Sequence, residues 1–255
     1  GVPLIVLKSA REIADMREAG RIVAEVFDLL QSRLGPGVTT AELDRLAQEL
    51  IEKRGAIPSF KGYRGFPGSI CASVNEEVVH GIPSVDRRLH AGDIVSIDVG
   101  AIYQGYHGDA AKTFAIGKVS EEALNLLEAT EGGLYAGIER ARSGNRFGDI
   151  SAAIQRYVEG RGLSLVREYT GHGIGKRMHE APQILHYVNA GDPVRGRRLR
   201  PGMTFALEPM VNVGTWKTEL LGDGWTVVTQ DRKLSAHFEH TLAVGEHGPE
   251  ILTRL

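Results

Sequence analysis

Apolar residues recur at intervals of three and four along two stretches near the N-terminus, residues 9–34 and residues 39–54. This spacing places apolar side chains on one face of a helix, so each stretch predicts an amphipathic helix. Each opens with a hydroxyl residue followed three positions later by glutamate, the pattern of a capping box, and each closes at a glycine. These residues are Ser9, Glu12 and Gly35 for the first helix, and Thr39, Glu42 and Gly55 for the second.

The two expected helices are followed by short segments rich in β-branched residues, and the same order then repeats. Residues 120–144 and 146–162 predict a second helix pair, although each glycine inside a helix costs about 1 kcal/mol relative to alanine. The expected strands are residues 69–75, 93–103 and 107–117 in the first round, and 163–169, 203–212, 225–231 and 237–245 in the second.

This repeated order predicts a mixed α/β fold with two similar halves, roughly residues 9–117 and 118–247. No run rich in proline and serine separates the halves, so we expect a single domain over residues 1–255 with a shared sheet. A chain of 255 residues is long enough to bury a substantial core.

The composition limits which cellular compartment and which binding partners are expected for the protein. The formal net charge is −2, so the charge of the whole chain gives no reason to expect binding to nucleic acid or to an anionic membrane. The sequence contains no apolar run long enough for a transmembrane helix and no signal-peptide pattern. Cys71 is the single cysteine, which excludes an intrachain disulfide and suits a reducing compartment. We therefore expect a cytoplasmic protein.

Two aspartates stand in segments where strands are normally apolar. Asp98 faces away from its apolar neighbours in residues 93–103, and Asp109 lies in the next expected strand. If the two strands form a hairpin centred between Tyr103 and Gln104, the carboxylates lie directly opposite each other. Two charges ~4 Å apart repel by ~4 kcal/mol at an effective dielectric near ~20. A shared proton, a basic partner or a bound cation must offset this repulsion, unless Asp109 only caps the turn.

Two glutamates and a histidine extend the pattern. Glu208 and Glu239 each interrupt an apolar, strand-like run. Either alone fits an exposed edge strand, but four carboxylates in expected strands favour bound cations, because buried unpaired carboxylates are costly. His172 lies among glycines that leave the backbone free to approach a site. One imidazole with four carboxylates suits two divalent ions of Mn, Fe or Co, and Zn or Mg also fit.

Five segments of the sequence carry these polar residues and their neighbours: HGIP (80–83), DIVSIDVGAIYQGYHGDAAKTF (93–114), GHGIGKRMHEAPQILHY (171–187), FALEPM (205–210) and SAHFEHTLAV (235–244). Together, in this order, they resemble the corresponding segments of type I methionine aminopeptidases, which are pita-bread metallopeptidases. The resemblance spans roughly residues 9–247. It implies an α+β fold in which two pseudo-symmetric α/β halves surround a curved, largely antiparallel sheet with helices on its outer face.

The resemblance implies removal of the initiator methionine from nascent proteins and peptides, with a preference for a small second residue. A metal-activated water would attack the first peptide bond. His80 and His179 match the two histidines that contact the substrate and transition state, and Glu208 matches a proton-transferring residue. The implied ligands of two metal ions are Asp98, Asp109, His172, Glu208 and Glu239, with Asp109 and Glu239 bridging the ions.

The resemblance also implies two binding sites beyond the metal ligands. The methionine side chain would enter an apolar pocket formed by Tyr63, Phe66, Cys71, Met178 and Trp225. Some family members have a monovalent-cation site at the positions of Asn75, Glu77 and Ser235.

Three positions depart from the family pattern. Phe60 stands where some relatives have cysteine, Met178 where many have phenylalanine, and His237 where glutamine is frequent. None of these changes removes a ligand. They bear on the shape of the pocket and on metal preference.

Two other functions are compatible with the same fold. Proline-directed peptidases such as prolidase or aminopeptidase P share the fold, but they carry a sizeable N-terminal domain, and the sequence ahead of Asp98 leaves no room for one. A metal-free binding protein that reuses the fold would be expected to lack ligands, and all five are present.

Nascent polypeptide N-termini are the implied substrates, which is compatible with transient ribosome contact, and we expect a monomer.

Overall fold

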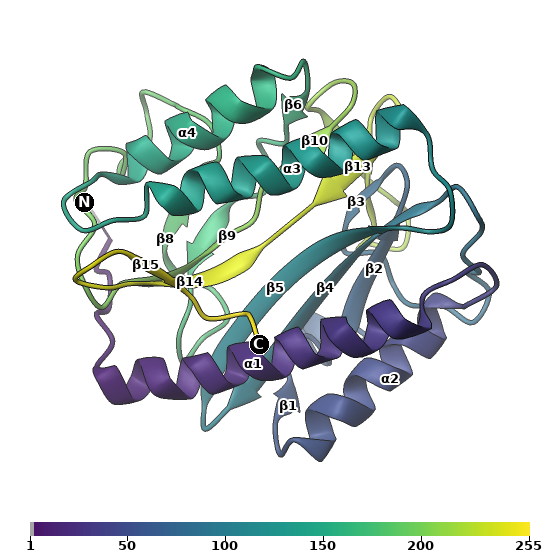
Figure 1. Ribbon diagram of the computed structural model, residues 1–255, viewed down its shortest axis with the longest axis horizontal. Coiled ribbons are helices and arrows are strands. Elements are labelled where there is room, and N and C mark those ends of the chain that lie inside the picture. The colour runs from purple at the N-terminus through teal and green to yellow at the C-terminus, as the bar shows by residue number, and fades with distance from the viewer. Residues whose placement is uncertain (1–2) are drawn as a thin grey trace.

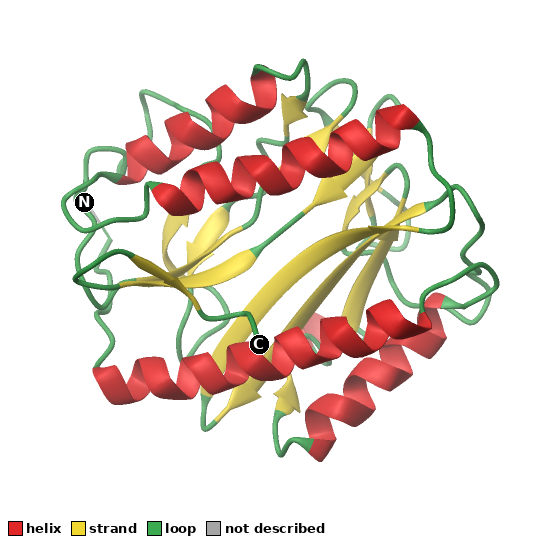
Figure 2. Ribbon diagram, in the orientation of Figure 1, coloured by secondary structure: helices red, strands yellow, loops and turns green. Residues whose placement is uncertain are grey.

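Four α-helices flank a layer of curved strands in the computed structural model, which describes residues 3–255 (Figures 1 and 2). Helices α1 (Ala10–Arg33) and α2 (Thr40–Lys53) run below the strands in Figure 1, and α3 (Glu121–Glu139) and α4 (Phe147–Glu159) run above them. All four expected helices are therefore present, with ends that differ from the expected ones by a few residues.

The caps explain where the first two helices begin. Ser9 and Glu12 form the expected reciprocal capping box of α1. The Thr39 hydroxyl accepts a hydrogen bond from the Glu42 N–H at 3.2 Å, but among residues 3–255 the return bond from the Thr39 N–H to the Glu42 carboxylate is missing. The second capping box is therefore only half formed.

Fifteen short strands pair in an antiparallel manner within residues 3–255, in four hydrogen-bonded groups. Their bounds are β1 (Ile57–Pro58), β2 (Ile70–Val74), β3 (Glu77–Val79), β4 (Ile94–Tyr103), β5 (Tyr106–Ala115), β6 (Ser164–Leu165), β7 (Gly171–Gly173), β8 (Glu180–Ile184), β9 (Thr204–Leu207), β10 (Met210–Asn212), β11 (Thr218–Leu220), β12 (Val227–Thr229), β13 (Ser235–His237), β14 (His240–Val244) and β15 (Pro249–Ile251). The groups are β1-β4-β2 with β5 on β4, β15-β14-β9-β7-β8, β13-β10-β6 and β11-β12-β3.

The two larger groups are joined at Ala111 of β5. The Ala111 N–H donates to the Glu239 carbonyl at 3.2 Å, and the Glu239 N–H donates to the Ala111 carbonyl at 2.9 Å. These two bonds attach the connection between β13 and β14 to the long β4–β5 hairpin. Strands from distant parts of the sequence are thereby fixed around a common position.

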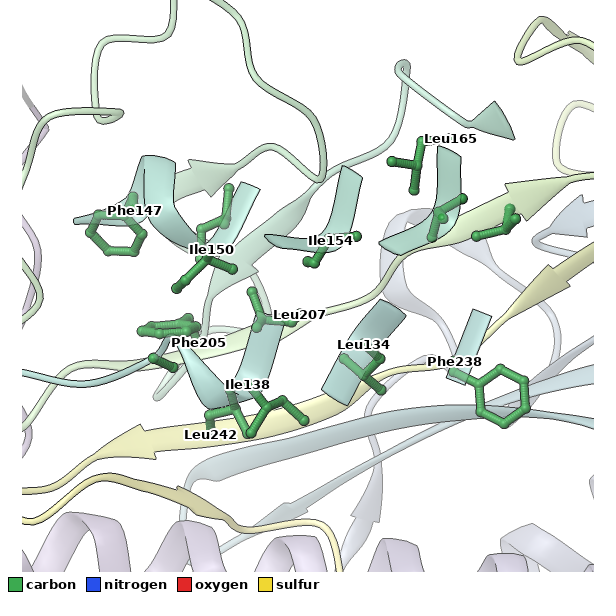
Figure 3. Packing of buried hydrophobic residues seen from close by; sticks show 14 of the residues in the cluster. Leu134, Ile138, Phe147, Ile150, Ile154, Leu165, Phe205, Leu207, Phe238 and Leu242 are labelled. Atoms are coloured by element: carbon green, nitrogen blue, oxygen red, sulfur yellow. The ribbon is translucent and has the colours of Figure 1, made fainter. Parts of the chain in front are cut away.

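A large core cluster fills the space between the helix pair α3–α4 and the strands (Figure 3). Phe147 and Ile154 from α4 and Leu134 from α3 point toward Phe205 of β9 and its neighbours, and all four side chains are buried. Gly137 lets the two helices approach, because a Cβ there would lie 2.7 Å from the Ile154 side chain. The glycine that weakens α3 as an isolated helix is thus required by its packing.

The turn of the β4–β5 hairpin differs from the expected one by one residue. Gln104 and Gly105 form the turn with φ angles of 51° and 84°, and positive φ at both central residues is the requirement of a type I′ hairpin turn. Asp98 therefore pairs with Ala111, and Asp109 with Gly100. The prediction that the two aspartates are directly opposed is wrong. They are diagonal neighbours on the same face of the hairpin. The residue paired with Asp98 is 111 instead of 109, and a shift of two residues keeps both side chains on that face.

Two of the expected strands are each divided into two. Residues 203–212 form β9 and β10 with Glu208 and Pro209 between them, and residues 237–245 contribute to β13 and β14 with Phe238 and Glu239 between them. Pro209 has no N–H for a ladder, and the backbone of Glu239 is bonded to β5 instead. Both glutamates therefore lie at breaks between strands rather than inside them.

Other strand predictions differ in extent. Only Ser164–Leu165 of the expected 163–169 strand is formed, while β7, which contains two glycines, and β8, which contains Pro182, were not predicted as strands. Glycine and proline both have low strand propensity, so sequence pattern alone understates such segments.

Candidate metal centre and substrate pocket

The four carboxylates and His172 converge on one position from five places in the fold. Asp98 comes from β4, Asp109 from β5 and His172 from β7, and the two glutamates come from the strand breaks. Two sets of side chains each offer ligand atoms that all lie within 4.8 Å of one another. The first set is Asp98, Glu208, His237 and Glu239, and the second is Asp109, His172 and Glu239.

These side chains fit divalent cations because their polar atoms are buried without partners. Within residues 3–255, one oxygen of Asp98, one of Asp109 and both of Glu239 accept no hydrogen bond, and Nε2 of His172 has no hydrogen-bond partner. Glu239 is 1% exposed and Asp109 is 4% exposed. Buried carboxylate oxygens with no donor are costly, and a shared cation satisfies several at once.

The pKa values of the four carboxyl groups are shifted as expected for a crowded, buried acidic site. Burial, together with the neighbouring carboxylates, raises the pKa of Asp98 and the pKa of Glu239 well above their usual values. Burial likewise raises the pKa of Asp109. Burial acts the same way on Glu208, but the imidazoles of His172 and His237 that face its carboxylate outweigh burial and hold the pKa of Glu208 well below its usual value.

His172 is oriented as a metal ligand. Its Nδ1–H donates to the Gly173 carbonyl at 2.9 Å, which leaves the lone pair of Nε2 directed into the cluster. Nε2 lies 3.3 Å from Glu208, 3.7 Å from Asp109 and 3.8 Å from Glu239. Burial alone lowers the pKa of His172, but the surrounding carboxylates raise it to about 9, so this nitrogen favours a positive charge, either a proton or a cation.

The two other predicted histidines stand beside the cluster. The His179 ring lies 4.4 Å from the His172 ring between centroids, and its Nδ1 is hydrogen-bonded to the Tyr63 hydroxyl at 2.9 Å. His80 packs edge-on against Tyr169. Burial lowers the pKa of His179 to about 4 and also lowers the pKa of His80, so both rings are neutral near pH 7.

One cavity of about 470 Å³ connects the cluster with an apolar pocket. Phe66 and Trp225 pack edge-to-face with centroids 5.1 Å apart, and Phe60 adds to the same hydrophobic cluster. The lining includes the five side chains predicted for the methionine pocket, which are Tyr63, Phe66, Cys71, Met178 and Trp225. It also includes three histidines and three carboxylates of the site: His80, His172, His179, Asp98, Asp109 and Glu208.

The candidates for a monovalent-cation site lie together, outside the lining of this cavity. The Ser235 N–H donates to the Asn75 carbonyl at 3.0 Å. Glu77 accepts the Val74 N–H at 2.7 Å. Asn75 has a φ of 57°, which turns the backbone at this point. A cation at this site remains a prediction.

Two histidines that the sequence did not assign to the site contact Glu208. Nε2 of His186 accepts the Glu208 N–H at 3.1 Å, and Nε2 of His237 lies 3.3 Å from Glu208 Oε2. The spacing of His237 two residues before Glu239 was a usable signal, because such residues share a strand face. His186 follows a glycine-rich stretch whose strands were not recognised, so its position could not be predicted.

The fold and the buried acidic cluster define a metallopeptidase. The model of metallopeptidase family M24 matches residues 14–246, and the chain belongs to this family. The chain is 56% identical to a methionine aminopeptidase of Clostridium acetobutylicum, covering 98% of this chain and 99% of that one. It is 55% identical to methionine aminopeptidase 1 of Bacillus subtilis, covering 99% and 100%.

Solved structures confirm the pita-bread fold. A methionine aminopeptidase from Thermotoga maritima superimposes with a TM-score of 0.95 at 44% identity, covering 99% of this chain and 100% of that chain. A prolidase from Pyrococcus furiosus superimposes with a TM-score of 0.77 at 21% identity, and there the match covers only 66% of its chain. The second likeness shows the shared fold alone. Across residues 3–255, no helix has the length and apolar character needed to cross a membrane.

Proposed function

We propose that the protein is a methionine aminopeptidase that releases the N-terminal methionine of peptides and nascent proteins whose second residue is small. One observation carries the proposal: a single cavity joins the unpartnered acidic cluster to an apolar pocket that contains Met178 and Cys71. Soft, adaptable side chains suit a thioether substrate side chain. The full-length similarity to methionine aminopeptidases supports the same assignment.

The metal centre would be formed by Asp98, Asp109, His172, Glu208 and Glu239, with Asp109 and Glu239 shared between two divalent ions. The donor set of one imidazole and four carboxylates suits Mn, Fe or Co, and Zn or Mg also fit. Ions held there supply Lewis acidity, which lowers the pKa of a water molecule and polarises the scissile carbonyl.

The surrounding residues would position the substrate and move protons. Glu208 is ionised and can accept a proton from the attacking water and return it to the leaving amine. If the Tyr63 hydroxyl donates to Nδ1 of His179, the remaining ring proton is on Nε2, where it can donate to the developing oxyanion. His80 would contact the nitrogen of the residue after the scissile bond.

The acidic end of the cavity, with its ions bound, would account for cleavage at the terminal residue only. A free α-amino group in its neutral form has a lone pair that a divalent ion held by these carboxylates would accept, whereas the amide nitrogen of an internal peptide bond offers no such lone pair. With the amine held there, the side chain of the first residue points into the pocket of Phe66, Met178 and Trp225.

Asp109→Asn is the first test of this function. We expect the chelator-stripped parent to release methionine from a Met-Ala-Ser peptide only after Mn, Co or Fe is restored, and the variant to release it at least ~100-fold more slowly, since it loses a bridging charge. Free methionine is the readout. Asp28→Asn, on the exposed face of α1, is the matched control.

The outcomes separate the alternatives. Cleavage of Leu-Pro but not of Met-Ala-Ser would contradict the pocket assignment and favour a proline-directed peptidase. An absence of both activities, together with no metal uptake by the parent protein, would favour a metal-free binding protein.

The proposal extends to the macromolecular substrates, the cellular compartment, the oligomeric state and a monovalent cation. Nascent polypeptide N-termini are the substrates, which places the enzyme in the cytoplasm with transient contact to the ribosome. We further propose that it acts as a monomer, because the site is built from one chain, and that Asn75, Glu77 and Ser235 hold a monovalent cation.

A further inference from the structure

Glu208 is held between two imidazoles, one on each carboxylate oxygen. Nε2 of His172 lies 3.3 Å from Oε1, and Nε2 of His237 lies 3.3 Å from Oε2. His237 ends β13, pairs with Met210 of β10, and is 2% exposed. The two contacts have equal length, so distance alone does not distinguish the roles of the two histidines.

The hydrogen bonds of the two rings do distinguish them. Nδ1 of His172 already donates to a backbone carbonyl, which leaves Nε2 free to bind a metal. His237 has a different arrangement: its ring contacts the ionised Glu208 carboxylate through Nε2. A carboxylate facing a ring nitrogen favours the proton on that nitrogen. His237 therefore donates its Nε2–H to Glu208, whereas Nε2 of His172 would offer its lone pair to a cation.

The backbone of His237 is fixed from β5. Its N–H donates to the Thr113 hydroxyl at 2.9 Å, and the same hydroxyl lies 2.9 Å from the His237 carbonyl, to which it can donate. Thr113 is also hydrogen-bonded to Ser96 of β4 at 2.8 Å. This arrangement attaches His237 to the hairpin that carries Asp98 and Asp109. The ring can hold Glu208 in a constant orientation relative to the other candidate ligands.

We propose that His237 is a positioning residue: its Nε2–H holds Oε2 of Glu208, so that Oε1 is presented to the metal held with His172. This rests on the proposed function, because it assumes that Glu208 is a ligand. A carboxylate held by one oxygen is restricted to binding a cation through the other. Without the donor, the Glu208 side chain can rotate, and metal affinity falls although every ligand remains.

Two substitutions separate the hydrogen bond from the bulk of the ring. His237→Leu fills similar space without a donor, and His237→Gln places an amide N–H close to the position of Nε2. We expect His237→Leu to weaken Mn(II) binding by ~10–100-fold, as is usual when a residue that orients a ligand is lost. We expect His237→Gln to restore binding to near the parent value. His90→Gln, an exposed histidine, is the control.

Three measurements decide the proposal on chelator-stripped protein. Calorimetric titration with Mn(II) gives the affinity, pulsed electron paramagnetic resonance of the Mn(II) protein counts coordinated imidazoles, and thermal unfolding without metal reports folding. We expect one coordinated imidazole in the parent and in both variants. If His237→Leu does not unfold cooperatively, His237→Asn replaces it, because its amide is too short to reach Glu208 and the same loss of affinity is then expected.

Two results would overturn the proposal. One is Mn(II) affinity in the folded variant without the donor that equals that of the parent. The other is a second coordinated imidazole in the parent that disappears in His237→Gln, which would make His237 a ligand. Failure of the parent itself to bind Mn(II) or release methionine is a different result, since it contradicts the proposed function and not the role of His237 alone.

Discussion

Single hydrogen bonds determine which ring nitrogens of the site carry protons. The neighbours of His172 and His179 differ, although the two rings are in contact: a backbone carbonyl accepts from one, and a tyrosine hydroxyl faces the other. Under the proposed function, the first arrangement would prepare a metal ligand and the second a donor to substrate. Tyr63 would then take part in the chemistry through His179 as well as lining the pocket.

Tyr63→Phe tests this role. Removing the hydroxyl leaves Nδ1 of His179 without its partner at 2.9 Å, so the proton is no longer directed to Nε2. A net hydrogen bond of about 1 kcal/mol corresponds to a decrease in kcat of about 5-fold. We expect this decrease with nearly unchanged KM and metal affinity, measured by steady-state kinetics on Met-Ala-Ser. Tyr103→Phe, at the turn of the β4–β5 hairpin, is the control. An increase in KM alone would instead assign Tyr63 to substrate binding.

At the scale of elements, helix α1 lies directly on β5 because two glycines cross there. A Cβ on Gly20 would lie 2.1 Å from the Leu252 carbonyl oxygen, and a Cβ on Gly108 would lie 2.8 Å from the Gly20 nitrogen. In both cases the obstacle is backbone, of the segment directly after β15 for Gly20 and of α1 for Gly108, and backbone cannot rotate away as a side chain can. This contact fixes α1 against the hairpin that carries two candidate ligands.

Gly20→Ala and Gly132→Ala form a matched pair that tests how closely α1 packs on the backbone at Leu252. Both replace a helical glycine by a better helix former, which alone gains about 1 kcal/mol. At Gly132 the obstacle is the Tyr157 ring, a side chain that can rotate away. We expect Gly132→Ala to be neutral or stabilising, and Gly20→Ala to lower the free energy of unfolding by about 1–3 kcal/mol, as overpacking does. Urea denaturation measures both. Equal effects at the two positions would contradict the account.

The elements also show what could be predicted from sequence. The helices follow from periodicity and caps, four of the five candidate ligands follow from acidic residues in apolar runs, and the fifth, His172, follows from its place among glycines. The hairpin register depended on positive φ at Gln104, which residue type does not reveal. The positions of Glu208 and Glu239 at strand breaks depended on Pro209 and on a bond from β5. His186 could not be placed, because contacts between distant strands determine its neighbours, whereas the position of His237 two residues before Glu239 was a signal that could have been used.

At the scale of the whole molecule, the candidate metal centre connects the two large strand groups. Asp98 and Asp109 belong to the β4–β5 hairpin, while His172 lies on β7 of the other large group and Glu208 directly follows β9 of that group. The division of the chain into similar halves at about residue 118 stays a prediction. A cation bound by ligands from both groups adds to the stability of their association, and it does so only in the folded state.

Metal removal should therefore lower the stability of the entire protein in one transition. With free metal at ~100 times Kd, binding contributes ~2.7 kcal/mol to the free energy of unfolding, and about 2–4 °C in Tm is expected per kcal/mol for a chain of this size. Scanning calorimetry with and without chelator measures the shift. Asp28→Asn should keep it and Asp109→Asn should lose it. Without metal, the Asp109→Asn protein should be at least as stable as the parent, because one buried charge is removed from a cluster of like charges. A shift confined to one of two separate transitions would mean that the ions stabilise one strand group and leave the other independent.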